Sequence, residues 1–330
     1  MKKYTIMSIT RKKSKRKRKN SWQSLNKKII IEYKKGEILS TFKILKENKD
    51  FWEIETDVVL GGTCVKKLVK TANNELAMFK YNKYPMCTEL ASEKMCYEIA
   101  KVLDFRCAKI DLAIDKNGVY GILNYIFISP NSSHTDASLY LRDDNFERKK
   151  TYTIENIKAF LDNYEIDLFS QFIEIMIFDA LVGEQDRHEE NWGITTIKNP
   201  LLRYSISPLY DNSCNLLRDQ INKLDNFENP EYLNNYIKRS KTAIYKDGKK
   251  INHFDLIKEL IETNPEASIT RIKKLENLTD NKISNIVNNI PEEYLTQKHK
   301  KYIIKYISKR RDILLNMIKV EVNKKWKHCC

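Results

Sequence analysis

The sequence predicts an α+β fold with two lobes, of which the first is rich in β-strands and the second is mainly helical. Residues 28–128 contain short runs of β-branched and aromatic residues separated by polar turn signals. From residue 154 onward, helical patterns dominate. The stretch 129–150 is polar and turn-rich, which is typical of a lobe boundary. We therefore expect a basic, disordered arm at 1–25, a β-rich first lobe at 26–130 and a helical second lobe at 131–330.

The first lobe is expected to hold three short strands, two hairpins and one helix. The short strands are KIIIEY, ILSTFKIL and FWEIE. The turn TANNE joins VVLGGTCVKKLVK to LAMFKY, and the turn DKNG joins CAKIDLAI to VYGILNYIFI. Between these hairpins, ELASEKMCYEIAKVLDF places five apolar residues at helical spacing: Leu90, Met95, Ile99, Val102 and Leu103.

One segment of the second lobe is apolar on nearly every face. This segment, IDLFSQFIEIMIFDALVG, is predicted to be a helix buried on most sides. Gly183 at its end suits a C-terminal cap. The polar residues that follow must therefore emerge from the interior, and we expect them to be held rigidly at the edge of a cleft.

These polar residues form an ordered set, GEQDRHEENWGI, which is followed by SPLYDNS. Asp186 and Asn191 are five residues apart, the spacing of the aspartate and asparagine in the catalytic loop of protein kinases. In that arrangement the aspartate accepts the proton of an attacking hydroxyl, and the asparagine oxygen helps to hold Mg²⁺. Asp211 would supply the second metal ligand. Arg187 and His188 are expected to brace the loop, with His188 beside the nucleotide.

A phosphotransferase also needs a lysine on an inner strand, held by a carboxylate of a helix, to contact the nucleotide phosphates. LAMFKY supplies Lys80 at the end of an apolar strand. Glu93 lies thirteen residues later, in the first turns of the predicted helix. Both residues are therefore assigned to the catalytic set, together with Asp186.

Two further segments are assigned to the nucleotide, which we expect to be ATP. The protein-kinase pattern GxGxxGxV is absent, but GGTCVKK lies where a loop over the phosphates is expected. Its candidate contacts are Gly61, Gly62, Thr63 and Lys66. The adenine is expected between the lobes, beside a hinge at residues 125–129, where Tyr125 would contact it.

The combination of GEQDRHEENWG, SPLYDNSCNLL and the Lys80–Glu93 pair resembles the HipA-like kinases, and it is most similar to their small, cell-translocating type. The resemblance extends over residues 55–300 and includes KTAIYKDGKKINHFDLI. It implies a two-lobed protein-kinase-like fold, ATP with Mg²⁺, and phosphorylation of serine or threonine in proteins. It also implies that Asp186 is the base and that Asn191 and Asp211 bind the metal.

The sequence departs from this family at two places. The phosphate loop of the HipA proteins carries a serine for regulatory autophosphorylation, whereas GGTCVKK offers Thr63. HipA itself also has an amino-terminal subdomain, which helps it to dimerise with a DNA-binding partner. We expect this subdomain to be largely missing here, since few residues precede the expected first lobe.

Two other functions are consistent with parts of the pattern. The order DRHxxN is also found in phosphoinositide kinases, and a basic arm would suit an anionic membrane surface. Their DFG segment is absent after the second metal acid. The other alternative is a nucleotide-binding or nucleic-acid-binding module with little or no turnover, although all the expected catalytic residues are present.

The net charge of +15 is concentrated in one segment. Residues 1–20 contain ten lysines and arginines and no acid, which leaves only +5 for the other 310 residues. The run RKKSKRKRK is therefore expected to be a solvated, disordered arm. Alternatively, it contacts nucleic acid or other anionic surfaces. In a eukaryotic cell it would also resemble a nuclear-localisation signal.

The remaining composition predicts a packed intracellular protein. The chain has 42% hydrophobic residues, and its longest apolar candidate, IEIMIFDALV, is too short to span a membrane. Seven cysteines form no CxxC pair, which favours a reducing compartment. We expect a cytoplasmic protein that acts on a protein substrate, or alternatively one that is delivered into a host cell as an effector.

Overall fold

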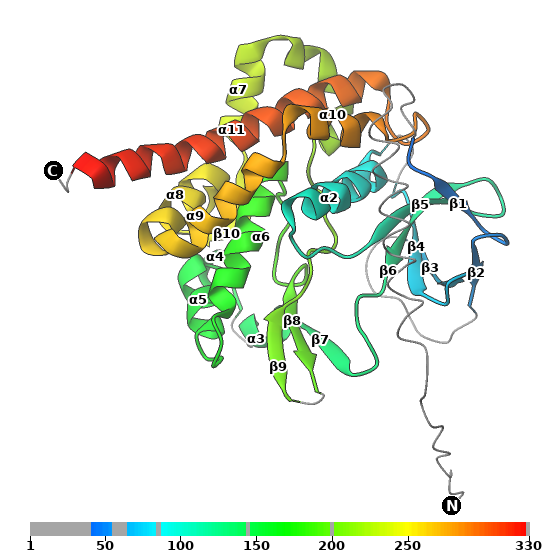
Figure 1. The fold of residues 1–330 in the computed structure, drawn as a ribbon, viewed down its shortest axis with the longest axis horizontal. Coiled ribbons are helices and arrows are strands. Elements are labelled where there is room, and N and C mark those ends of the chain that lie inside the picture. Colours follow the sequence, from blue (N-terminus) through cyan, green and yellow to red (C-terminus); the bar gives the residue numbers. More distant parts are fainter. Residues whose placement is uncertain (1–40, 55–64, 84–86, 143–145, 199–200, 328–330) are drawn as a thin grey trace, which may run out of the picture. The chain divides into compact units, whose positions relative to one another are not determined.

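The computed structural model describes residues 41–54, 65–83, 87–142, 146–198 and 201–327 (Figure 1). The predicted arm, the run KIIIEY and the loop residues Gly61, Gly62 and Thr63 lie outside these residues. Within them, a six-stranded sheet and one helix precede a mainly helical part. The predicted α+β class is therefore confirmed.

The first part of the described chain is a curled sheet with the strand order β1-β5-β6-β4-β3-β2. The strands are β1 (Ile44–Lys46), β2 (Phe51–Glu53), β3 (Lys66–Thr71), β4 (Leu76–Tyr81), β5 (Ile110–Ile114) and β6 (Tyr120–Tyr125). β1 is parallel to β5, and the other neighbours are antiparallel. β3 with β4 and β5 with β6 form the two predicted hairpins, and their turns use Asn74 and Gly118 at positive φ.

Helix α2 (Glu89–Leu103) covers one face of this sheet, where it packs on β5 and β6. The register places Lys80 opposite both Lys66 and Ile122, so these three side chains share a face. Ile122 belongs to the same hydrophobic core as the buried residues of α2, which identifies this face as the one toward α2. Phe79 and Leu123 point to the opposite face and form a second, smaller cluster inside the curl.

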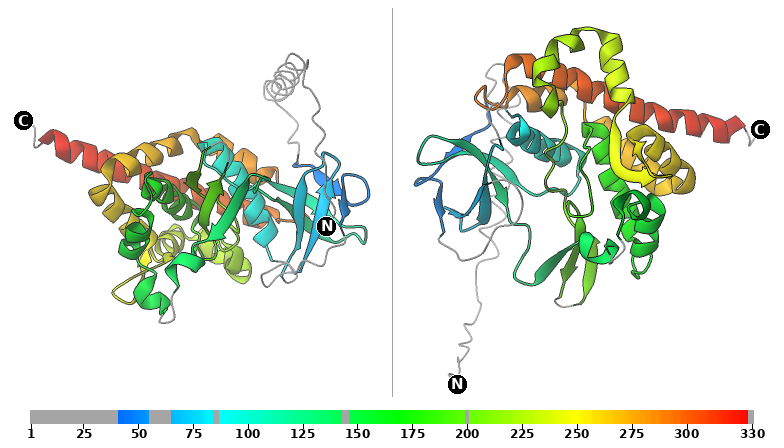
Figure 2. Two further views of the ribbon diagram at one scale, coloured as in Figure 1. Left: turned by 90° about the horizontal axis from the view of Figure 1, so that it is seen from below. Right: turned by 180° about the vertical axis from the view of Figure 1, so that it is seen from behind.

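The helix predicted to be buried on most sides is α6 (Leu168–Val182), and the structure confirms it. Twelve of its 15 residues are buried. The helices α8 (His253–Thr263), α9 (Pro265–Lys273) and α11 (Gln297–Lys327) pack against it (Figure 2). It ends at Gly183, whose φ of 76° is the left-handed conformation that glycine adopts at low cost. A Cβ at this position would lie 2.0 Å from the Tyr306 hydroxyl of α11. Both the left-handed backbone and this close contact therefore require glycine.

The remaining helices surround the second part of the core. They are α3 (Ser138–Leu141), α4 (Arg148–Thr151), α5 (Ile154–Leu161), α7 (Pro230–Lys238), α8 (His253–Thr263), α9 (Pro265–Lys273) and α10 (Asp280–Asn288), with 3₁₀ segments at Arg218–Glu228 and Lys274–Asn277. In the described part of the chain, no helix is both long and apolar enough to cross a membrane.

The second part also contains strands that the sequence reasoning did not predict. β7 (Ser132–Asp136), β8 (Gly193–Ile197) and β9 (Arg203–Ile206) form an antiparallel sheet, and β10 (Lys241–Lys246) pairs with β11 (Lys249–Asn252). β7 lies in the stretch interpreted as polar turns, because its residues SSHTD carry no apolar alternation. Asp247 and Gly248, both at positive φ, form the tight turn of the second pair, and this Asp-Gly signal was available in the sequence.

Candidate active site

The loop between α6 and β8 carries Asp186 and Asn191, and it is closed by its own hydrogen bonds. The Asn191 side-chain nitrogen donates to the Asp186 carbonyl oxygen at 2.7 Å. Two backbone bonds add to this, from the His188 N–H to the Asp186 carbonyl and from the Asn191 N–H to the His188 carbonyl. The side-chain nitrogen of Asn191 is thus engaged in a hydrogen bond within the loop. Its side-chain oxygen remains available to coordinate a cation.

Arg187 fixes this loop against the segment that contains Asp211. Its buried guanidinium donates to the Asp179 carboxylate of α6, to the carbonyl oxygens of Asn191 and Tyr210, and to the Asn212 side chain. Burial lowers the pKa of Arg187, but the facing Asp179 carboxylate outweighs this effect and raises the pKa. One permanently charged group therefore positions both predicted metal ligands, by holding the Asn191 backbone and the residues on either side of Asp211.

Asp186 presents its carboxylate at the surface of the loop. The side chain is 52% exposed, with the Cys214 thiol at 3.6 Å and the His188 Nε2 at 3.9 Å from its carboxylate. His188 also accepts the Glu190 N–H through Nδ1, which connects its ring to the backbone of the loop. A carboxylate in this setting can accept a proton from a hydroxyl group that approaches from solvent.

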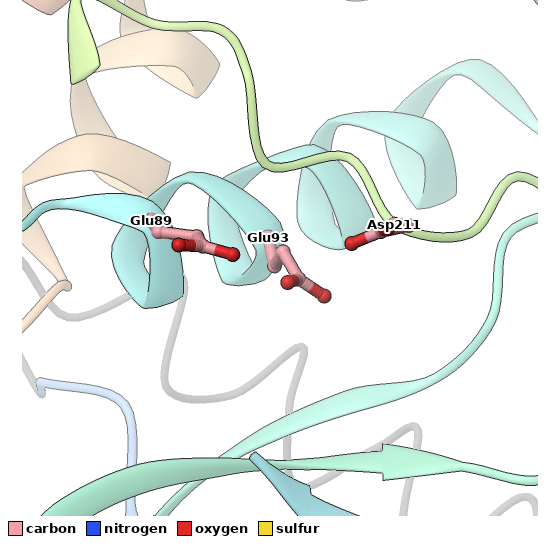
Figure 3. Close-up of side chains that lie close together, drawn as sticks. All are labelled: Glu89, Glu93 and Asp211. Atoms are coloured by element: carbon pink, nitrogen blue, oxygen red, sulfur yellow. The ribbon is translucent and has the colours of Figure 1, made fainter. Parts of the chain in front are cut away.

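Lys80 connects the sheet, α2 and the Asp211 segment in a single ion-pair cluster. Its buried ammonium lies 2.5 Å from Glu93, 2.8 Å from Glu89 and 3.1 Å from Asp211. Figure 3 shows the two glutamates on consecutive turns of α2, with Asp211 reaching toward them from the segment after β9. Burial lowers the pKa of Lys80, but the three carboxylates outweigh it and raise the pKa. The predicted Lys80–Glu93 pair is thus present.

Glu89 is a member of this cluster that the sequence reasoning missed. It precedes Glu93 by four residues, so a helix presents both carboxylates on the same side. The burial of Glu89, in the first turn of α2, follows from this position above the sheet. The sequence signal was therefore the i, i+4 spacing within ELASEK, which becomes informative once Lys80 is assigned.

Asp211 has the properties expected of a metal ligand. Its backbone is left-handed, with φ of 51°, and its side chain remains 45% exposed. Burial acts to raise the pKa of Asp211, but Lys80 and Lys66 outweigh it and lower the pKa, so the carboxylate is ionised at neutral pH.

The available donor atoms suit Mg²⁺. Glu89, Glu93 and Asp211 offer ligand atoms within 4.8 Å of one another, against the single ammonium group of Lys80 that contacts all three. The carboxylate of Asp211 and the amide oxygen of Asn191 are hard oxygen donors, which Mg²⁺ prefers. The residues present therefore fit the predicted ion.

The other predicted nucleotide contacts are only partly brought to this cluster. Lys66 shares the face of the sheet with Lys80, as the phosphate assignment requires. Tyr125 does not reach Lys80, because its side chain packs in the smaller cluster with Phe79, and its hydroxyl donates to Asp111. The alternation of side chains along β6 sends Tyr125 to the opposite face from Ile122. Its side-chain contact with adenine is not supported by this arrangement.

Comparisons with known proteins show the family and the fold of this chain. The family model of the HipA-like C-terminal domain matches residues 58–297. The serine/threonine-protein kinase CtkA of Helicobacter pylori strain J99 is 25% identical over 290 residues, which cover 81% of this chain and 86% of the relative. The crystal structure of a Helicobacter pylori proinflammatory kinase CtkA has a TM-score of 0.69 at 23% identity, covering 83% of this chain and 98% of that chain. The predicted family resemblance and the two-lobed, protein-kinase-like fold are confirmed.

Proposed function

Since this chain belongs to the HipA-like C-terminal domain family, we propose that it is a serine/threonine protein kinase that transfers the γ-phosphoryl group of ATP, with Mg²⁺, to protein hydroxyl groups. The observation that carries the proposal is the cluster in which Lys80 of β4 contacts Glu93 of α2 and Asp211 of the following lobe. A lysine on a strand, a glutamate on a helix and a metal-binding aspartate are the parts that kinase chemistry requires.

Asp186 acts as the base in this proposal. Its exposed carboxylate accepts the proton of the serine or threonine hydroxyl while the oxygen bonds to the γ-phosphorus, and the bond from this phosphorus to the bridging oxygen breaks, with ADP as the leaving group. The Asn191 and Glu184 hydrogen bonds hold the backbone of Asp186 on both sides, at the carbonyl and at the N–H. This support matters because a base contributes fully only when it lies within hydrogen-bond reach of its proton.

Asn191 and Asp211 would hold Mg²⁺, through the side-chain oxygen of the first and the carboxylate of the second. When bound, the ion would neutralise part of the negative charge of the nucleotide phosphates. Arg187 contributes by fixing the backbone of Asn191 and of Tyr210, the residue before Asp211.

Lys80 must exchange a partner to contact a phosphate. An ammonium group has three N–H donors, and three carboxylates already surround this one. Glu89 and Glu93 are almost fully buried, whereas Asp211 is the most distant and the most exposed of the three. We therefore expect the bond to Asp211 to be given up when the nucleotide binds, which also frees that carboxylate for the metal.

The test is phosphotransfer from γ-labelled ATP by the purified protein, with Mg²⁺ or with EDTA. We expect label on serine or threonine of added protein substrate, or of the chain itself, only when Mg²⁺ is present. Phosphoinositide vesicles serve as the competing acceptor, and Lys80→Ala serves as the inactive control. Label on inositol lipid without label on protein would replace this proposal with a lipid kinase. Stabilisation by MgATP without transfer to either acceptor would indicate a binding module.

A further inference from the structure

Glu184 is a buried carboxylate at the start of the catalytic loop whose side chain joins two functional segments. It is 1% exposed, and its Oε1 accepts the Asp186 N–H at 2.9 Å. Its Oε2 accepts the Cys214 N–H at 3.1 Å and the Asn215 side-chain nitrogen at 2.9 Å. A single side chain thus binds both the backbone of the base and the segment that follows Asp211.

We propose that Glu184 is a positioning residue that sets the placement of Asp186 relative to the metal-binding segment. Arg187 holds that segment at Tyr210 and Asn212, whereas Glu184 holds it at Cys214 and beyond. The two residues therefore fix the segment on both sides of Asp211. The inference rests on the proposed function, because Asp186 must be the base for its placement to affect a rate.

The charge of Glu184 is set by the groups around it. Burial raises the pKa of Glu184 to about 7, which Arg187 opposes and Asp179 reinforces. Burial also raises the pKa of Asp179 itself, against the effect of its ion pair with Arg187. Four other titratable groups face Glu184: Cys96 of α2, Cys214, Tyr306 of α11 and His253 of α8. Burial raises the pKa of the two thiols and of the tyrosine hydroxyl, and it lowers the pKa of the imidazole. All four groups are therefore neutral near pH 7.

The protonation state of Glu184 decides how many of its bonds survive. All three contacts are donated to the carboxylate, so the ionised form accepts all of them. The protonated form places an O–H against an N–H donor and loses at least one contact. The carboxylate is protonated below its pKa and ionised above it. Glu184 therefore fixes the Asp186 backbone firmly at pH values above about 7 and less firmly below. The wild-type rate should therefore rise as the pH increases through this range.

The experiment compares Glu184→Gln with Glu189→Gln as a matched control. Glu189 is also a buried glutamate of this loop, but it contacts Arg142 and Arg148 and not Asp186. Burial raises the pKa of Glu189, but its bonds to Arg148 and Arg142 outweigh this and lower the pKa, so it does not titrate near pH 7. We expect Glu184→Gln to lose the rise near pH 7 and about ten- to hundredfold in kcat, with a KM for ATP within about threefold of wild type. Glu189→Gln should keep the rise.

Amide hydrogen exchange provides a second readout that needs no catalysis. After correction for intrinsic rates, protection of the Asp186 and Cys214 amides should fall between pH 8 and pH 6 in wild type and stay constant in Glu184→Gln. If the wild-type protein transfers no phosphate, the proposed function is wrong. The exchange result still shows whether Glu184 holds the backbone of Asp186 and Cys214.

A pH-dependent rate and exchange in Glu184→Gln equal to those of wild type would overturn the inference. If Glu184→Gln does not fold, the kcat of Glu184→Asp and its pH dependence test the inference instead. Its shorter carboxylate cannot reach both segments, so we expect a lower kcat with the pH-dependent rise kept, and an unchanged kcat would count against the inference.

Discussion

Asp186 and Asp211 are both aspartates of the same site, but their surroundings differ in ways that separate their roles. Asp186 is exposed and lies 3.9 Å from the His188 imidazole, whereas Asp211 lies against the Lys80 ammonium group. Burial acts to raise the pKa of Asp211, but Lys80 outweighs it and lowers the pKa. Replacement by asparagine keeps the size of each side chain and removes its charge. The two variants should therefore fail in different steps.

We expect Asp186→Asn to lose about 10²–10⁴ in phosphotransfer while MgATP still stabilises the protein, because only the base is removed. Asp211→Asn should lose both activity and most of the MgATP-dependent rise in melting temperature, since Mg²⁺ loses an anionic ligand. Asp104→Asn is the control, because Asp104 is also an aspartate at positive φ, at an exposed helix end outside the site. Equal effects of the two site variants on MgATP binding would contradict the assigned roles.

At the level of residues, the sequence predicted those parts of the site that depend on local spacing. Asp186 and Asn191 are close because the loop between them is short, and Lys80 and Glu93 follow from a strand and the next helix. Tyr125 was assigned by its place near the hinge, but its orientation depends on the phase of β6, which pairing with β4 fixes. Glu184 needed Cys214 and Asn215, 30 and 31 residues away, to acquire its role.

At the level of elements, the helices and strands that could be predicted are those with a clear hydrophobic pattern. The two hairpins, α2 and α6 bury apolar residues that are visible in the sequence: as β-prone runs around turn signals, at helical spacing in α2, and on nearly every face in α6. β7 has no such period, because it is held by backbone pairing with β8 next to the catalytic loop. That strand also requires Gly193, since a Cβ there would lie 2.1 Å from the Thr135 carbonyl oxygen. Backbone pairing of this kind requires few particular residue types, so it is hard to predict from the sequence.

The end of α6 offers a test of how strongly one element positions the loop. Gly183→Ala should destabilise the protein by the ~1–2 kcal/mol of a left-handed alanine and by a further amount, because its Cβ meets the buried Tyr306 hydroxyl. Gly248→Ala is matched, with φ of 71° and nothing within 4 Å of the added Cβ. Urea unfolding of both variants should show the larger loss for Gly183→Ala. Equal losses would mean that Tyr306 moves aside without cost.

At the level of the whole molecule, the sheet is attached to the helical part by contacts that are very distant in sequence. The Tyr294 hydroxyl lies 2.7 Å and 2.8 Å from the carbonyl oxygens of Ala113 and Gly121, and the Phe42 N–H donates to the Asn289 carbonyl. α2 lies between β5 and α10 and joins the two sides through one hydrophobic core. The sequence predicted two lobes, but it contained no signal for these attachments, because each partner is an ordinary residue of its own element.

The charge distribution of the chain gives the last prediction. Residues 1–20 carry ten of the 59 lysines and arginines, whereas the hydrophobic core and all the described site residues come after residue 41. Deletion of residues 1–20 should therefore leave the melting temperature and its MgATP-dependent rise nearly unchanged. Retention on heparin and on anionic vesicles should fall steeply, since each cation that contacts a phosphate releases counterions. A full-length variant with these ten residues changed to serine separates charge from length, and it should behave like the deletion. A large loss of melting temperature in the deletion alone would show that residues 1–20 belong to the folded body.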